Sequence, residues 1–98
     1  MPATPTPSAA DWCVYLILCD NNAFYCGISK DAPKRFAAHC AGKGARYTRM
    51  HRPVSMRIIA DGLEQGDALA WEARLKKLNR AQKENWWAQG QEIGQNGL

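Results

Sequence analysis

The sequence has 98 residues, of which 46% are hydrophobic, so it is long enough for one compact domain and too short for two ordinary ones. It contains no run of about 20 apolar residues that could span a membrane, and residues 1–10 lack the basic start and apolar centre of a secretory signal. We therefore expect a soluble, cytoplasmic protein.

The net charge of +4 is unevenly distributed along the chain. Residues 30–57 carry eight basic side chains and one acidic side chain, whereas the rest of the chain carries five basic and eight acidic ones. Clustered Lys and Arg side chains are typical of a face that binds phosphates, because solubility alone requires only interspersed charges. The pattern favours a polyanion as the partner, with a solvated basic face that binds nothing as the alternative.

The four cysteines are separated by 6, 7 and 14 residues. Neither a CxxC redox pair nor a zinc knuckle has this spacing, so buried free thiols are the simplest interpretation in a cytosolic chain. A zinc protein that uses Cys13, Cys19, Cys26 and His39 is a minor alternative.

The first predicted elements are two strands. Residues 1–10 contain three prolines, and we expect them to form a flexible leader outside the fold. Residues 12–19 and 23–29 are apolar at nearly every position and are separated by the polar sequence Asp-Asn-Asn. This pattern predicts a β-hairpin in a sheet that is covered on both faces.

The register of the hairpin depends on its turn. A two-residue loop at Asn21-Asn22 places Tyr25 opposite Leu18, whereas a turn centred on Asp20 places Tyr25 opposite Tyr15. Both registers are compatible with the sequence.

A helix is predicted from about Asp31 to Gly42. Asp31 can cap the first turn, Pro33 is tolerated there, and glycine commonly ends a helix. Residues 42–53 contain four cations and no acid, which suits an exposed loop or a short helical turn. Residues 54–61 then predict a third strand beside the hairpin.

Two further helices are predicted in the C-terminal part of the chain. Apolar residues recur at steps of three and four over residues 67–78, which predicts a helix that packs on the sheet. Asn79 and Gln82 resemble a capping box that begins the second helix. The polar, glycine-rich segment 90–98 is expected to fray. The chain is thus predicted to fold as an α+β domain over residues 11–89, with a three-stranded antiparallel sheet and the order β-β-α-β-α-α.

Several side chains on these elements are candidates for chemistry. Arg35 and His39 share one face of the first predicted helix, although an exposed Arg beside a surface His is a common arrangement without function. Glu72 lies at the edge of an apolar stripe, where a carboxylate is costly unless it is paired or bound to a metal. Its structural alternative is an ion pair with Lys76 at i+4. Gly27 weakens a strand unless another group approaches its backbone closely, and a phosphate is one candidate for that group.

Together these residues resemble the GIY-YIG nuclease domain, and more narrowly its small stand-alone bacterial members of the URI type. The motifs CVY (13–15) and YCG (25–27) are followed by Arg35, His39 and Glu72 in the order and spacing of that family. Six positions in the right order on the expected elements are a specific signal, whereas a three-letter motif alone is weak.

The resemblance implies a metal-dependent nuclease that hydrolyses phosphodiester bonds of DNA with little sequence specificity. Tyr15 would take the proton of the attacking water, and Arg35 would stabilise the charge that develops on the phosphate. Tyr25 and His39 would position the water or the phosphate. Glu72 would hold a single Mg²⁺, for which Mn²⁺ is a substitute.

The basic segment after the first predicted helix would track the nucleic-acid backbone, with an aromatic ring available to stack on a base. The residues assigned to nucleic-acid binding are Gly27, Lys34, Lys43, Arg46, Tyr47, Arg49 and Arg52. DNA is the expected partner, with RNA as an alternative, and the protein is expected to be a monomer or a weak homodimer.

Two positions depart from the family pattern. Ile28 stands where some relatives carry a lysine, and Glu84 falls near a position where several hold an asparagine. The alternative function is therefore a nucleic-acid-binding module that keeps the nuclease fold and cleaves weakly or not at all.

Overall fold

The computed structural model describes residues 9–95, so the leader predicted over residues 1–10 lies outside the described residues except for its last two. The elements are η1 (Ala9–Asp11), β1 (Trp12–Cys19), β2 (Phe24–Ser29), α1 (Ala32–Cys40), α2 (Arg46–Met50), β3 (Pro53–Leu63), α3 (Gln65–Lys76), α4 (Arg80–Gln89) and β4 (Gln91–Gln95). This is the predicted α+β order with two additions: the short helix α2, where a loop or a short helical turn was expected, and one strand at the end.

The strands form one antiparallel sheet in the order β2-β1-β3-β4. The prediction of β3 beside the hairpin is confirmed, but the predicted number of three strands is wrong. The fourth strand lies within residues 90–98, where Ile58 pairs with Gln91 and Ser55 with Gln95. Its sequence is mostly polar, and its one apolar side chain, Ile93, packs against the core. A short polar segment acquires strand structure here because β3 offers a free edge.

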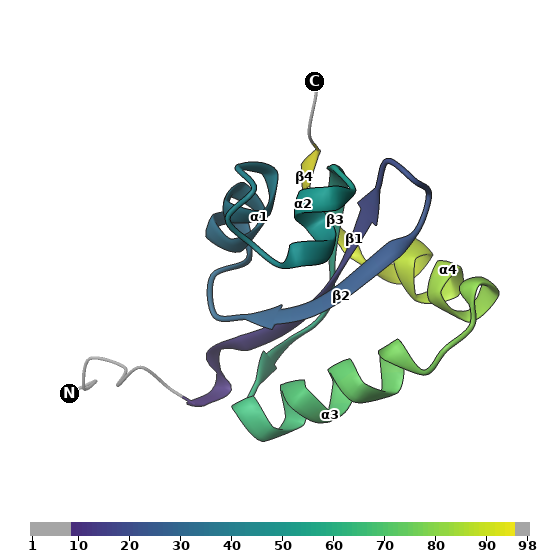
Figure 1. Ribbon diagram of the computed structural model, residues 1–98. Helices are drawn as coiled ribbons and strands as arrows, with labels where there is room; N and C mark the ends of the chain where they lie inside the picture. Colours follow the sequence, from purple (N-terminus) through teal and green to yellow (C-terminus); the bar gives the residue numbers. More distant parts are fainter. Residues whose placement is uncertain (1–8, 96–98) are drawn as a thin grey trace.

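Helices cover both faces of the sheet, as the apolar strands predict (Figure 1). Alternate residues of β1 point to opposite faces: Tyr15 and Ile17 enter the core under α1 and α2, whereas Val14 and Leu16 enter the core under α3 and α4. The hydrophobic effect therefore holds β1 from two sides, and Tyr15 lies on the α1 side.

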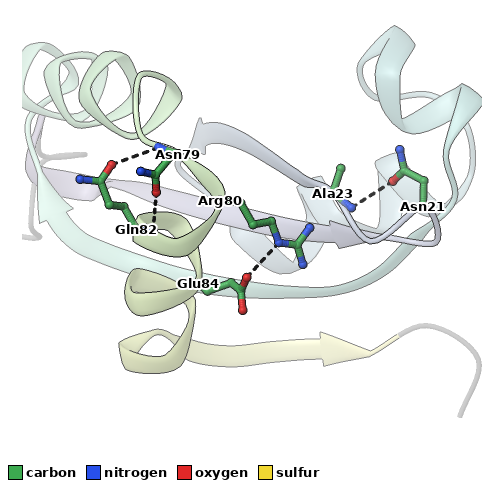
Figure 2. A network of polar contacts seen from close by, with 6 residues as sticks. All are labelled: Asn21, Ala23, Asn79, Arg80, Gln82 and Glu84. Carbon is green, nitrogen blue, oxygen red and sulfur yellow. Dashed lines mark hydrogen bonds and ion pairs between the residues drawn. The ribbon is translucent and has the colours of Figure 1, made fainter.

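The hairpin turn differs from both predicted registers. Cys19 donates its N–H to the Ala23 carbonyl at 2.9 Å, and the Asn22 N–H donates to the Cys19 carbonyl at 2.9 Å. Asn22 has a φ of 68°, which is the left-handed conformation that asparagine tolerates. The turn is centred on Asn21, whose side-chain oxygen accepts a hydrogen bond from the Ala23 N–H (Figure 2). The resulting register places Tyr25 opposite Ile17 and leaves Tyr15 opposite a glycine.

Side chains cap two of the helices as the sequence predicts. The Asp31 carboxylate accepts a hydrogen bond from the Lys34 N–H at 3.1 Å, with Pro33 in the first turn of α1. Asn79 and Gln82 form a reciprocal capping box at the start of α4 (Figure 2). Each cap satisfies amides that have no partner within the helix.

No helix in the described part of the chain is long and apolar enough to cross a membrane. The cysteines are free thiols, and Cys13, Cys19 and Cys26 are buried.

Candidate active site

Tyr15 lies in the middle of β1 with only 1% of its surface exposed. Its hydroxyl lies 3.0 Å from Nε2 of His39, which α1 places over this face of the sheet. Gly27 is directly opposite Tyr15 on β2, and a Cβ at that position would lie 2.5 Å from Cζ of the tyrosine ring. The group that approaches Gly27 closely is therefore Tyr15, and the contact of Gly27 with a phosphate stays a prediction.

His39 is fully buried and has a hydrogen-bonding partner at each ring nitrogen. Nδ1 lies 2.7 Å from Oγ1 of Thr48, whose hydroxyl donates to the Ala45 carbonyl at 2.9 Å. A Cβ added at Gly44 would lie 2.7 Å from two carbons of the His39 ring, so glycine is needed for the ring to fit. The imidazole is thus held in one position between Tyr15 and Thr48.

Burial keeps both of these groups neutral. Burial raises the pKa of Tyr15 to about 12, and the nearby Arg35 guanidinium offsets only part of that rise. Burial and, second, the positive charge of Arg35 lower the pKa of His39 to about 4. At neutral pH the site therefore presents a phenol hydrogen-bonded to an uncharged imidazole.

A row of aromatic rings leads outward from His39. Tyr25 lies beside His39 with ring centroids 5.4 Å apart, and Tyr47 stacks on Tyr25 at 6.2 Å with an interplanar angle of 16°. His51 contacts the Tyr47 ring at 4.8 Å, and the Asn21 amide donates to the Tyr47 hydroxyl at 2.9 Å. The predicted stacking residue Tyr47 is therefore already part of a row of rings that connects α2 to the predicted catalytic residues Tyr25 and His39.

Arg35 and Lys34 lie on the exposed side of α1. They line a surface cavity of about 180 Å³ together with Ser29, Asp31 and Ala38. Arg35 is also close enough to Tyr15 to lower the pKa of its hydroxyl against the effect of burial. Its two cations suit a phosphate group.

The other predicted nucleic-acid-binding cations, Lys43, Arg46, Arg49 and Arg52, surround α2 and are exposed. None of the four takes part in an ion pair within residues 9–95. Arg49 and Arg52 line a second cavity of about 230 Å³, and His39 forms part of its wall. The positive charge of this region is therefore available to an anionic partner.

Glu72 lies on α3, on the opposite face of the sheet from Tyr15. Its side chain is 21% exposed and lies 3.6 Å from Nζ of Lys76, which is the ion pair that the sequence offered as an alternative. The Cys26 thiol has its pKa raised to about 12 by burial and, second, by the charge of Glu72. The charge of Glu72 thus acts on Cys26, which faces the α3 side of the sheet and directly precedes Gly27.

The structure brings Tyr15, Tyr25, Arg35 and His39 together, and it adds two residues that the sequence analysis missed. Thr48 is 2% exposed and bonds to His39, and Gly44 makes room for the same ring. A threonine and a glycine in a basic loop carry no signal of their own, since their role depends on how α2 packs against α1.

Comparison with known proteins bears directly on this geometry. Residues 11–85 match the GIY-YIG catalytic domain, which is most of the chain. The chain belongs to the GIY-YIG family. Members of this family are generally nucleases that act on DNA, so the protein has a nuclease-type domain.

Several GIY-YIG relatives are small proteins of similar extent. A UPF0213 protein of Neisseria meningitidis serogroup A is 54% identical over 86 residues, which cover 88% of this chain and 94% of that protein. A UPF0213 protein of Xanthomonas axonopodis pv. citri is 44% identical, covering 76% of this chain and 74% of its own. A UPF0213 protein of Vibrio cholerae is 45% identical, and the match covers 74% of this chain and 73% of that protein. No solved structure matches the chain.

The donor set at Glu72 fits one hard, hydrated cation. Within residues 9–95, no three His, Cys, Asp or Glu side chains gather into a group that could hold a metal. Mg²⁺ needs only one or two carboxylates because it keeps most of its water. An ion pair such as that between Glu72 and Lys76 contributes only about 0–1 kcal/mol to stability. A single carboxylate such as that of Glu72 is of a type that can hold a hydrated Mg²⁺.

The two departures from the GIY-YIG pattern have structural roles. Ile28 is half-buried and packs in the core under α3, on the same face as Glu72. Glu84 is exposed and forms an ion pair with Arg80 at 3.1 Å (Figure 2). Neither residue lies among the groups around Tyr15.

Proposed function

We propose that this GIY-YIG protein is a metal-dependent nuclease that hydrolyses phosphodiester bonds of DNA. The observation that carries the proposal is the buried Tyr15–His39 hydrogen bond of 3.0 Å with Arg35 beside it. A phenol, an imidazole and a guanidinium in this arrangement can move a proton next to a phosphate and stabilise the charge that develops there.

The phosphate would bind in the cavity lined by Arg35 and Lys34, where the guanidinium can donate two hydrogen bonds to phosphate oxygens. The exposed cations around α2 would hold the neighbouring nucleotides by their phosphates. Contacts to phosphates carry no sequence information, which supports little sequence specificity. The aromatic row through Tyr25 and Tyr47 joins α2 to the reacting group.

In the proposed reaction, a water attacks phosphorus in line and loses a proton to Oη of Tyr15. A phenol with a pKa of about 12 is almost never ionised at neutral pH. Tyr15 must therefore release its own proton to Nε2 of His39 as it accepts the proton of water. A P–O bond forms to the water oxygen, and the bond from phosphorus to the leaving oxygen breaks. The leaving oxygen takes up a proton from solvent, and the His39 imidazolium releases its proton to solvent.

The negative charge of a bound phosphate favours this transfer, because an anion nearby raises the pKa of an imidazole. Arg35 balances the charge on the phosphate as the water attacks. Glu72 would hold Mg²⁺, and the ion would supply Lewis-acid stabilisation of phosphate oxygens.

The test is a cleavage assay with purified protein on single-stranded, duplex and branched DNA and on RNA, in Mg²⁺, Mn²⁺ or EDTA. Metal-dependent products are expected, and the Glu72→Gln and Arg35→Ala variants should lose at least about 100-fold in rate. Glu64→Gln, an exposed carboxylate at the other end of α3, is the matched control. The proposal fails if no metal-dependent product forms, or if both site variants cut as fast as the parent.

The same assay separates the second candidate function, a nucleic-acid-binding module without efficient cleavage. Its support is Ile28, a packed apolar side chain where some relatives carry a lysine. Salt-sensitive DNA binding that persists in Glu72→Gln, together with no cleavage by the parent, would favour the binding module. Sedimentation of the same preparations decides between a monomer and a weak homodimer.

A further inference from the structure

We propose that Thr48 is a positioning residue of this site: its hydroxyl holds His39 in the tautomer protonated at Nδ1, so that Nε2 is free to accept the proton of Tyr15. The catalytic consequence rests on the proposed nuclease function. The tautomer itself does not depend on that function and can be measured separately.

The available hydrogens fix the directions of three consecutive hydrogen bonds. The Ala45 carbonyl can only accept, so the single hydroxyl hydrogen of Thr48 is used in the 2.9 Å bond to that carbonyl. Oγ1 of Thr48 must then accept in its 2.7 Å contact with His39, which places a hydrogen on Nδ1. A neutral imidazole carries only one N–H hydrogen, so Nε2 is an acceptor and the Tyr15 hydroxyl donates across the 3.0 Å contact.

The fold prevents the chain of contacts from reversing. Thr48 stands three residues after Ala45 at the start of α2, and a helical threonine is held in few rotamers when its hydroxyl bonds to the carbonyl three residues back. Thr48 and His39 are both buried, with 2% and 0% of their surfaces exposed. Gly44 closes on the imidazole ring from the side of Nδ1. The direction of every hydrogen bond is therefore set by the Ala45 carbonyl.

The opposite tautomer would leave the site unable to pass the proton on. With hydrogen on Nε2, the imidazole would donate to Oη of Tyr15 and could not accept from it. Tyr15 would then have to take the proton of water without releasing its own. In metal sites and catalytic sites alike, the partner of one histidine nitrogen sets the role of the other nitrogen.

Two variants test the role of Thr48. Thr48→Val keeps the size and β-branching of the side chain but removes the hydroxyl, and Thr48→Ser restores the hydroxyl. The first readout is ¹⁵N NMR of the His39 ring in the intact protein without DNA, which shows directly which nitrogen carries hydrogen. The second readout is the separation of kcat from KM in DNA cleavage. Ser55→Ala, a buried polar side chain on β3, is the control for general destabilisation.

In the parent, in Thr48→Ser and in Ser55→Ala, hydrogen is expected on Nδ1. Thr48→Val should shift hydrogen toward Nε2 and lower kcat about 10- to 100-fold, since positioned proton transfer contributes about 100-fold or more. KM should stay within about twofold because the buried Thr48 side chain is not expected to reach DNA. Thr48→Ser should recover most of the parent kcat.

The outcomes of the two readouts are distinguishable. Hydrogen on Nε2 in the parent overturns the inference, and this measurement decides the matter even if Thr48→Val does not fold. An unchanged tautomer in folded Thr48→Val also overturns it. A third outcome is hydrogen on Nδ1 of His39 in the parent but not in Thr48→Val, together with no DNA cleavage by the parent. In that case the positioning role of Thr48 stands and the proposed nuclease function fails.

Discussion

Gly27→Ala is expected to disturb the candidate site because the added methyl group meets the Tyr15 ring. The added Cβ would lie 2.5 Å from Cζ and 3.0 Å from Cε1 of Tyr15, whereas carbon atoms in contact prefer about 3.5–4.0 Å. The ring or strand β2 must therefore move by roughly 1 Å. Tyr15 is 1% exposed and packed on all sides, so the movement cannot be absorbed at the surface.

The magnitude follows from the contacts that change. Overpacking costs about 1–3 kcal/mol, and a displaced hydroxyl no longer reaches His39, which costs about 1–3 kcal/mol for buried groups left without partners. Alanine recovers about 0.5–1 kcal/mol because glycine is unfavourable in a strand. We expect a net loss of about 1–5 kcal/mol in the free energy of unfolding, or roughly 4–40 °C in Tm at about 4–8 °C per kcal/mol for a domain of this size.

The assay combines urea unfolding, followed by circular dichroism, with DNA cleavage at a temperature where the variant stays folded. Cleavage should fall at least about 100-fold, because the Tyr15–His39 proton transfer loses its geometry. Gly66→Ala is the matched control, since a Cβ there meets nothing within 4 Å and the residue lies in α3. The reasoning is refuted if Gly27→Ala matches Gly66→Ala in both stability and cleavage.

Three further predictions concern stability. The pKa of His39 falls from 6.5 to about 4 on folding, so its contribution to stability should be complete above pH 6.5 and should be lost as pH falls toward 4, by up to about 3 kcal/mol. Urea unfolding at several pH values measures this loss, and the same loss of stability at low pH in His39→Phe would contradict the prediction. Asn79→Ala should cost about 1 kcal/mol through loss of the capping box, measured by thermal unfolding, and a neutral effect would show that the cap is not stabilising. A chain that ends at Gln89 lacks β4 and the Ile93 contact, so it should lose about 1–2 kcal/mol in the free energy of unfolding, and its Tm should fall by several degrees. An unchanged Tm would mean that β4 contributes nothing to stability.

Local patterns in the sequence carried the prediction of most elements. The apolar run of β1 predicted a strand buried on both faces, and the two cores on either side of the sheet confirm it. Asp31 and Asn79 marked the starts of α1 and α4, because a capping side chain acts on amides only two or three residues away. β4 was missed because its polar sequence is weak evidence of a strand, and its pairing depends on the free edge of β3.

The candidate site shows the same division. The sequence by itself placed Tyr15, Tyr25, Arg35 and His39 on the right elements, since each belongs to a motif with its own local spacing. Only the tertiary structure decided that Tyr15 faces Gly27 and forms a hydrogen bond with His39, because a register shifted by one residue would pair Tyr15 with other residues. Contacts between residues far apart in the chain depend on how the helices pack, and the direction of the Tyr15–His39–Thr48 hydrogen bonds is set by that packing.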